Sequence, residues 1–289
     1  MDKQTKTPAH PGVDQKTLWN GPAGRAWVEN QRLLDQLFAP FETLLASDDV
    51  LGAATRVLDV GCGTGATTLA LARRLGARGE CMGIDLSEPM TAVARTRAEQ
   101  EQSRAHFLAA DAQTHAFEGV DFDLIVSRFG VMFFDDPIQA FANLRHAARE
   151  DGRLSVIAWR SASENPFMTT AERAAAPLLP TLPVRLPGAA GQFAFAHPDH
   201  VRALLAESGW SDIDLQPIDV ACAMPESDLI PYLGWLGPVG LLLQTADKCT
   251  RTPVIDTLRA AFAPYVHGGE VRFNAACWQI SARAQAGVR

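Results

Sequence analysis

Residues 56–85 are RVLDVGCGTGATTLALARRLGARGECMGID, and this stretch decides the fold. The apolar run RVLDV is typical of a buried strand, and TTLALARRLG, which follows three closely spaced glycines, is typical of a helix. A second short strand, CMGID, ends at Asp85. Because strand, glycine turn, helix and strand follow one another directly, we predict a right-handed βαβ unit with the glycine turn at the carboxyl edge of a parallel sheet.

The alternation of short apolar runs and helical stretches continues as far as Arg160. The further strand-like runs are AHFLAADA (105–112), FDLIVSRF (122–129) and GRLSVIAWR (152–160), and each has a helical pattern next to it in the sequence. Strands that alternate with helices build parallel sheets covered on both faces. The sequence therefore predicts an α/β fold, a doubly wound, Rossmann-like, mostly parallel sheet of seven strands with helices on both faces.

The flanking segments are predicted to decorate this core within one domain, residues 1–289. Residues 1–16 are polar and predict a flexible arm, 17–50 a helical cap broken near Pro40, and 55–160 the cofactor-binding core. The proline-rich segment 161–200 predicts a lid insertion. Residues 201–289 predict the rest of the sheet, with a helix from about Pro198 to Ser208, strands at 212–220 and 271–281, and a helical insertion at about 222–268.

Composition excludes several kinds of partner. The 289 residues include 26 Lys and Arg against 33 Asp and Glu, a net charge of −7, which argues against nucleic acid and anionic membranes. No apolar stretch approaches the roughly 18 residues of a membrane span. The five cysteines are scattered, which favours reduced thiols in a cytoplasmic protein. We expect a monomer or homodimer that acts on a small molecule.

The glycine loop by itself leaves the ligand open. Gly61, Gly63 and Gly65 allow a tight turn and close approach of a ligand to the main chain, and with Ala66 they satisfy a dinucleotide fingerprint. Asp85 lies 20 residues after Gly65, where a carboxylate meets a ribose diol. Both NAD and a nucleoside sulfonium fit this pattern.

Four motifs in order carry a family resemblance: VLDVGCGTG, GIDLS, AADAQ and FDLIVSRFGVMFFDDP. Together they resemble the class I S-adenosylmethionine-dependent methyltransferases. More narrowly, the DVGCGTG loop with SRFGVMFF and DGRLSVIAWR looks like the bacterial small-molecule enzymes grouped with the ubiquinone/menaquinone methyltransferase-like proteins. The resemblance implies in-line transfer of a methyl group from S-adenosylmethionine to an O, N or C atom of a small, partly apolar or aromatic metabolite. The product would be S-adenosylhomocysteine, and no metal is implied.

The same resemblance assigns cofactor contacts to the strand ends. Asp85 would hold the ribose hydroxyls, and Asp111 the adenine amine, with the Ala112 N–H on a ring nitrogen. Asp59 would either meet the amino group of the methionine tail or accept from loop N–H groups. Leu86, Met90, Ser127, Phe129 and the loop residues Gly61, Cys62, Gly63 and Gly65 complete the expected set. Trp19 and Trp27 either close over the cofactor or pack against the sheet edge.

The sequence indicates catalytic residues less clearly than cofactor contacts, and no catalytic residue is assigned. Arg128 either holds an anionic substrate or pairs with Asp135 or Asp136. We expect His115 at the surface. The HPDH segment at 197–200 is typical of a helix start, so no metal site is expected there.

Apolar residues in the irregular segments predict a hydrophobic small-molecule pocket under mobile elements. They are Met132, Phe133, Phe134, Trp159, Phe167, Phe193, Phe195, Trp235 and Leu236. Two alternatives stay open, an NAD-dependent oxidoreductase and a non-catalytic cofactor-binding relative. The first is disfavoured because neither tyrosine, Tyr232 nor Tyr265, has a lysine four residues later.

Overall fold

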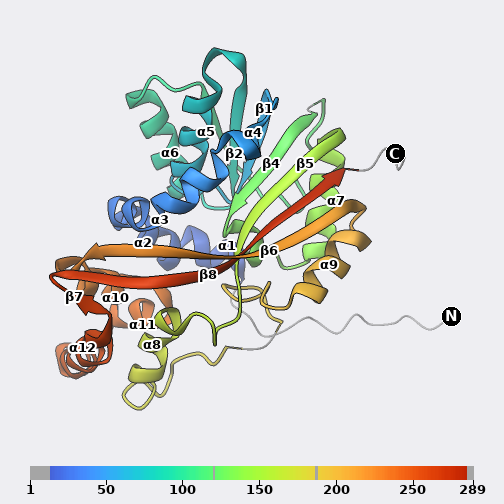
Figure 1. The fold of residues 1–289 in the computed structure, drawn as a ribbon. Coiled ribbons are helices and arrows are strands. Elements are labelled where there is room, and N and C mark those ends of the chain that lie inside the picture. Colours follow the sequence, from blue (N-terminus) through green and yellow to red (C-terminus); the bar gives the residue numbers. More distant parts are fainter. Residues whose placement is uncertain (1–13, 120, 186–187, 285–289) are drawn as a thin grey trace.

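The computed structural model describes residues 14–119, 121–185 and 188–284, which form one mixed eight-stranded sheet (Figure 1). Seven strands follow the order β3-β2-β1-β4-β5-β8-β6, and β7 pairs with β8. The strands are β1 (Arg56–Val60), β2 (Glu80–Asp85), β3 (Ala105–Ala109), β4 (Phe122–Arg128), β5 (Ala148–Trp159), β6 (Trp210–Pro225), β7 (Val266–His267) and β8 (Glu270–Ala284). The predicted α/β fold is confirmed, and the short β7 adds an eighth strand.

Strands β1 to β5 pair in parallel, and helices connect β1 to β2, β2 to β3 and β4 to β5. Helices α5 (Ala66–Leu75) and α6 (Glu88–Gln100) pack on β1, β2 and β3. Helices α7 (Pro137–Ala147) and α9 (Pro198–Glu207) contact β5 and β6 from the other face (Figure 1). The order reverses at β1 and β4, so the glycine turn after β1 lies at the switch point where such sheets bind ligands.

The antiparallel strands β6 and β8 are longer than expected and form a two-stranded ribbon that runs beyond the parallel sheet (Figure 1). At its far end lie α8 (Pro166–Ala175), α10 (Leu229–Trp235), α11 (Gly237–Leu243) and α12 (Lys248–Phe262). Phe167 of α8 stacks on Phe273 of β8 at 3.8 Å between ring centroids. The ribbon therefore carries a helical subassembly beside the carboxyl edge of the sheet.

The N-terminal helices are α1 (Gln15–Asn20), α2 (Pro22–Glu29), α3 (Gln31–Leu45) and α4 (Asp48–Leu51). The predicted arm up to residue 13 lies outside the described residues, and residues 15 and 16 already belong to α1. The predicted break near Pro40 is wrong, because α3 continues through it. Leu37, Phe41 and Leu45 are fully buried on α3. Their burial outweighs the roughly 3 kcal/mol that an interior proline costs a helix.

Two other boundaries also differ from the prediction. The lid segment 161–200 is not irregular throughout, because α8 forms within it. The insertion starts after Pro225 rather than at 222, because β6 stays paired with β8 as far as that residue. In the part of the chain that the structure describes, no helix is both long and apolar enough to cross a membrane.

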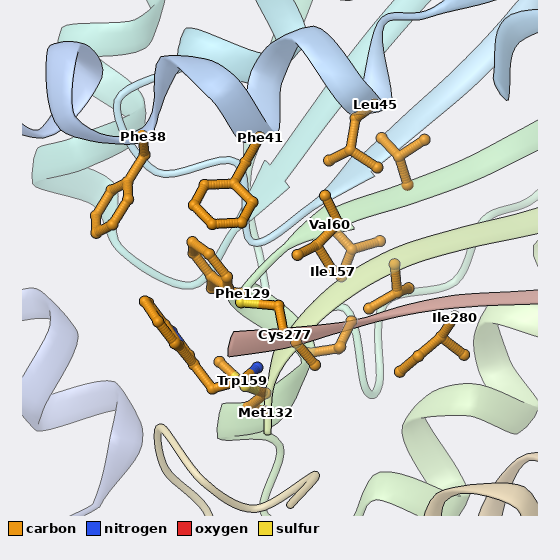
Figure 2. Close-up of a cluster of buried hydrophobic side chains, with 14 of the residues drawn as sticks. Phe38, Phe41, Leu45, Val60, Phe129, Met132, Ile157, Trp159, Cys277 and Ile280 are labelled. Carbon is orange, nitrogen blue, oxygen red and sulfur yellow. Dashed lines mark hydrogen bonds between the residues drawn. The ribbon is translucent and has the colours of Figure 1, made fainter. Parts of the chain in front are cut away.

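An aromatic cluster joins α3 to the carboxyl ends of β4 and β5 (Figure 2). Phe129 stacks on Trp159 with 4.8 Å between ring centroids, and Phe38 and Phe41 of α3 meet Phe129 edge-on at 5.5 and 5.0 Å. The Trp159 backbone N–H donates to the Met132 sulfur at 3.4 Å. This buried cluster holds the N-terminal helices against the edge where ligands of such folds bind.

Candidate functional site

The glycine turn after β1 has an open face and a packed face. Gly61, Gly63 and Gly65 all have positive φ, at 70°, 55° and 91°. A Cβ on Gly61 would lie 2.6 Å from Gly130 Cα, whereas a Cβ on Gly63 would meet only the Met90 sulfur, at 3.9 Å. Gly61 is therefore required by packing, and the Gly63 backbone is accessible to a ligand.

Asp85 braces this turn from the end of β2. One carboxylate oxygen accepts from the Gly63 N–H and the other from the Ser87 N–H, both at 2.8 Å. Burial raises the pKa of Asp85, and these two N–H groups oppose the shift. Each oxygen still has acceptor capacity, so the carboxylate suits a pair of ribose hydroxyls.

A cavity of about 130 Å³ opens above the turn. It brings together most of the residues predicted for the cofactor: Trp19, Gly61, Cys62, Gly63, Asp85, Leu86, Met90, Asp111, Ala112 and Phe129. Met90 is buried, and burial raises the pKa of the Cys62 thiol well above its usual value. The cavity thus offers acceptors at two strand ends and apolar surface between them, which fits an adenosine group.

Three of the predicted residues lie behind the turn rather than in the cavity wall. Asp59 accepts from the Thr68 hydroxyl at 2.6 Å and is almost fully buried. Ser127 donates to the Val60 carbonyl at 2.8 Å and accepts from the Gly130 N–H at 3.2 Å. A Cβ on Gly65 would touch Phe107 at 2.9 Å. In the free protein these residues shape the turn.

Sequence reasoning missed other residues of the wall, which come from the N-terminal helices and from positions beside the predicted residues within the quoted motifs. They include Gln15, Asp35, Thr64, Gln113 and Asp135. Gln15 lies one helical turn before Trp19, whose indole N–H donates to its side-chain oxygen at 3.1 Å. The position of Gln15, a polar residue one helical turn before Trp19, was the signal in the sequence that could have predicted its place in the wall.

The N-terminal helices are latched to the Asp85 turn. The Ser87 hydroxyl donates to the Trp19 carbonyl at 2.6 Å, and the Asn20 side chain donates to the Leu86 carbonyl at 3.0 Å. The Glu88 N–H donates back to Asn20 at 3.0 Å. The Trp19 ring meets Phe133 edge-on at 5.1 Å. Trp19 therefore closes over the cavity, one of the two placements expected for it.

A second, larger cavity of about 430 Å³ adjoins the first. The two share six lining residues: Gln15, Trp19, Trp27, Leu34, Phe129 and Phe133. Helices α8, α10, α11 and α12 supply the far walls, with Phe167, Trp235 and Leu236 among them as predicted. Phe195 lies elsewhere, because it packs on Phe141 with 6.0 Å between ring centroids. The larger cavity is mostly apolar and aromatic.

Arg128 lines the smaller cavity and points toward α3, not toward Asp135 or Asp136. Its guanidinium donates to the Phe38 carbonyl at 3.5 Å and lies 5.8 Å from the Phe38 ring centroid. Burial lowers its pKa, and Asp35 and Asp59 act in the opposite direction. The expected pairing is therefore wrong, because the aromatic cluster and the acidic groups near α3 hold the cation.

The histidines of the HPDH segment begin a helix, since His197 is the N-cap of α9. Among residues 14–119, 121–185 and 188–284, no group of three or more His, Cys, Asp or Glu side chains could hold a metal ion.

Comparisons with known proteins show the family of this chain. A family model described as a methyltransferase domain matches residues 57–152. A demethylmenaquinone methyltransferase of Thermus thermophilus is 30% identical over 167 residues, 55% of this chain and 76% of that protein. The aklanonic acid methyltransferase DauC of Streptomyces is 31% identical over 125 residues, 43% of this chain and 57% of that protein. The chain belongs to the class I S-adenosylmethionine-dependent methyltransferases.

Solved structures share the fold at low identity. The YcgJ protein of Bacillus subtilis has a TM-score of 0.57 at 18% identity, over 86% of this chain and all of that one. The [4+2]-cyclase SpnF has a TM-score of 0.52 at 20% identity, over 86% of this chain and 82% of that one. Both likenesses concern the fold alone.

Binding of S-adenosylhomocysteine is expected to strengthen as pH rises from about 5 to about 7 and then to level off. Burial raises the pKa of Asp59 to about 6, and the Thr68 hydroxyl opposes the shift. The ligand's ammonium keeps its proton in this range, and we expect it to interact with Asp59 and so to favour the ionised carboxylate. Binding then releases a proton below pH 6, so affinity rises by up to about tenfold per pH unit there.

Calorimetry in two buffers of different ionisation enthalpy measures this proton release. Asp59→Asn should flatten most of the profile, and the rest belongs to Asp85, whose pKa burial also raises. An unchanged profile in Asp59→Asn would show that Asp59 serves the turn alone.

The raised pKa of Asp59 affects the stability of the free protein in the opposite direction to its effect on ligand affinity. Between 3.8 and about 6 the folded protein holds the extra proton, so stability from this group falls as pH rises.

Proposed function

We propose that this methyltransferase acts on a small, partly apolar or aromatic metabolite that occupies the larger cavity. The observation that best supports this proposal is the wall that the two cavities share. Six residues line both, so a methyl group held above the glycine turn would reach an acceptor in the larger cavity past these residues. S-adenosylmethionine supplies a methyl group that is already activated on a sulfonium. The protein's contribution is then to orient the acceptor and exclude water, which can be worth about 7–11 kcal/mol.

We assign the cofactor contacts as follows. Asp85 holds the ribose hydroxyls, Asp111 and Ala112 the adenine edge, and Leu86 and Met90 the faces of the nucleoside. The accessible Gly63 backbone and the carboxylate pair at adjacent strand ends support this assignment. Asp59 acts on the methionine ammonium from behind the turn, and Ser127 keeps the turn in shape.

The acceptor is proposed to need no base from the protein. None of the six shared residues is ionisable, and the ionisable side chains that line the larger cavity among the described residues are Glu172, Arg185 and Tyr232. Glu172 and Arg185 are paired with each other. These observations favour an acceptor whose attacking atom is unprotonated, or loses its proton readily, at neutral pH.

We also propose that the chain acts as a single domain in the cytoplasm. The described strands form one continuous sheet, and the two cavities share lining residues, which supports the first point. Four of the five cysteines are buried free thiols, as suits a reducing compartment.

The decisive experiment incubates the protein with methyl-labelled S-adenosylmethionine and small-molecule extracts, and identifies the labelled product. We expect label in a compound with an apolar ring or chain. S-adenosylhomocysteine should raise the melting temperature, and NADH should not. A shift with NADH alone would favour the oxidoreductase, and binding without transfer to any extract would favour a non-catalytic relative.

A further inference from the structure

Among the residues that the structure describes, five polar side chains line the larger cavity: Gln15, Glu172, Arg185, Gln192 and Tyr232. Three of them satisfy one another. Arg185 donates through Nε to Glu172 at 2.7 Å and through Nη2 to Gln192 at 3.3 Å, and its guanidinium lies 4.8 Å from the Phe193 ring centroid. The Gln15 side-chain oxygen accepts from Trp19. The cluster around Arg185 therefore fastens the part of the lid segment that follows α8 to that helix.

Tyr232 differs from these four. Its hydroxyl donates to the Met168 sulfur at 3.7 Å, and a thioether is a weak acceptor. Met168 also lines the cavity. The Tyr232 ring lies among apolar neighbours, with Phe167 at 6.1 Å between ring centroids. The phenol hydroxyl of Tyr232 thus lies in an apolar wall and donates its hydrogen bond to a weak acceptor.

The hydroxyl stays protonated at neutral pH. Burial raises the pKa of Tyr232 well above its usual value, and Cys222 acts in the same direction. The group is therefore a permanent donor, and a partly buried donor with a weak partner favours any ligand that brings a better acceptor. A carbonyl or ionised hydroxyl oxygen is such an acceptor, and it can displace the sulfur without a change in the backbone.

We propose that Tyr232 is a specificity-determining residue that donates a hydrogen bond to an oxygen of the methyl acceptor. The acceptor is then an oxygenated aromatic or polycyclic compound, and not a plain hydrocarbon-like one. This inference rests on the proposed function, because it requires the larger cavity to hold the acceptor. Tyr232 positions the ring system, while the shared wall presents the attacking atom to the smaller cavity.

The test compares two probes of one carbon skeleton, 1-tetralone with a carbonyl oxygen and tetralin without it. Calorimetry on protein saturated with S-adenosylhomocysteine gives both dissociation constants. Tyr232→Phe should weaken 1-tetralone about fivefold, the value of one net hydrogen bond, and change tetralin less than about twofold. Tyr265→Phe is the matched control, since that hydroxyl pairs with Thr170 at 3.5 Å outside the cavity wall.

A second variant keeps the test sharp. Met168→Leu removes the sulfur partner, so 1-tetralone should bind as well as before or more tightly. Equal loss of both probes in Tyr232→Phe, no loss of either, or no binding of either probe to the loaded wild type would overturn the role of Tyr232. Failure of S-adenosylhomocysteine itself to bind would instead contradict the proposed function, so the two failures are distinguishable.

Discussion

Replacing Asp85 with alanine is expected to abolish the rise in melting temperature that S-adenosylhomocysteine causes in the wild type. The substitution removes both proposed ribose contacts, and it also leaves the Gly63 and Ser87 N–H groups without their acceptor. Two hydrogen bonds to a charged group are worth about 3–6 kcal/mol, a fall of roughly 10² to 10⁴ in affinity. Thermal unfolding with and without ligand, followed by calorimetry, measures the loss.

Asp123→Ala is the matched control for this prediction. Asp123 also braces backbone N–H groups of the sheet, those of Thr55 at 2.7 Å and Arg56 at 2.8 Å, but at the start of β1, the opposite edge. It should lower the melting temperature of the free protein and leave affinity for S-adenosylhomocysteine within about threefold, because it lies away from the cavity. Full affinity in Asp85→Ala would disprove our placement of the nucleoside.

Gly61→Ala is expected to destabilise the protein by about 2–5 kcal/mol. The positive φ of Gly61 costs an alanine about 1–2 kcal/mol, and the new Cβ would lie 2.6 Å from Gly130 Cα, an overlap with rigid backbone worth about another 1–3 kcal/mol. Because the turn then has to move away from Gly130, which follows β4, cofactor affinity should fall as well. Urea unfolding and calorimetry give the two values.

Gly76→Ala separates the two causes. Gly76 has a similar φ of 56°, yet a Cβ there meets nothing within 4 Å. This control should lose about 1–2 kcal/mol of stability and keep its affinity for S-adenosylhomocysteine. If both variants lost the same stability, the close approach of Gly61 to Gly130 would carry no energetic weight.

The parallel core was predictable because its signals are local. A run such as RVLDV, followed by glycines and an amphipathic stretch, specifies strand, turn and helix within about twenty residues. Pro40 was misjudged for the opposite reason, because the burial that keeps α3 intact comes from elements far away in the sequence.

The residues of the site also divide into those that local sequence signals predict and those that tertiary packing places. Asp85 and Asp111 follow from their positions at the ends of strands, where the topology places ligands. By contrast, the sequence shows no reason for Asp35 to join them, since α3 reaches the cavity by packing across the switch point. Nor does it show that Asp59 and Ser127, at equally good strand ends, face the turn and not the cavity.

By itself, then, the sequence determined the class of fold, the glycine turn and the acidic strand ends, because hydrophobic periodicity and glycine geometry act over short distances. Only the tertiary structure decided how the rest is used. It placed the N-terminal helices over the cofactor cavity, set four helices at the end of the β6–β8 ribbon, and left Tyr232 as a donor in an apolar wall. Those arrangements depend on packing between segments up to about two hundred residues apart, for which no local pattern exists.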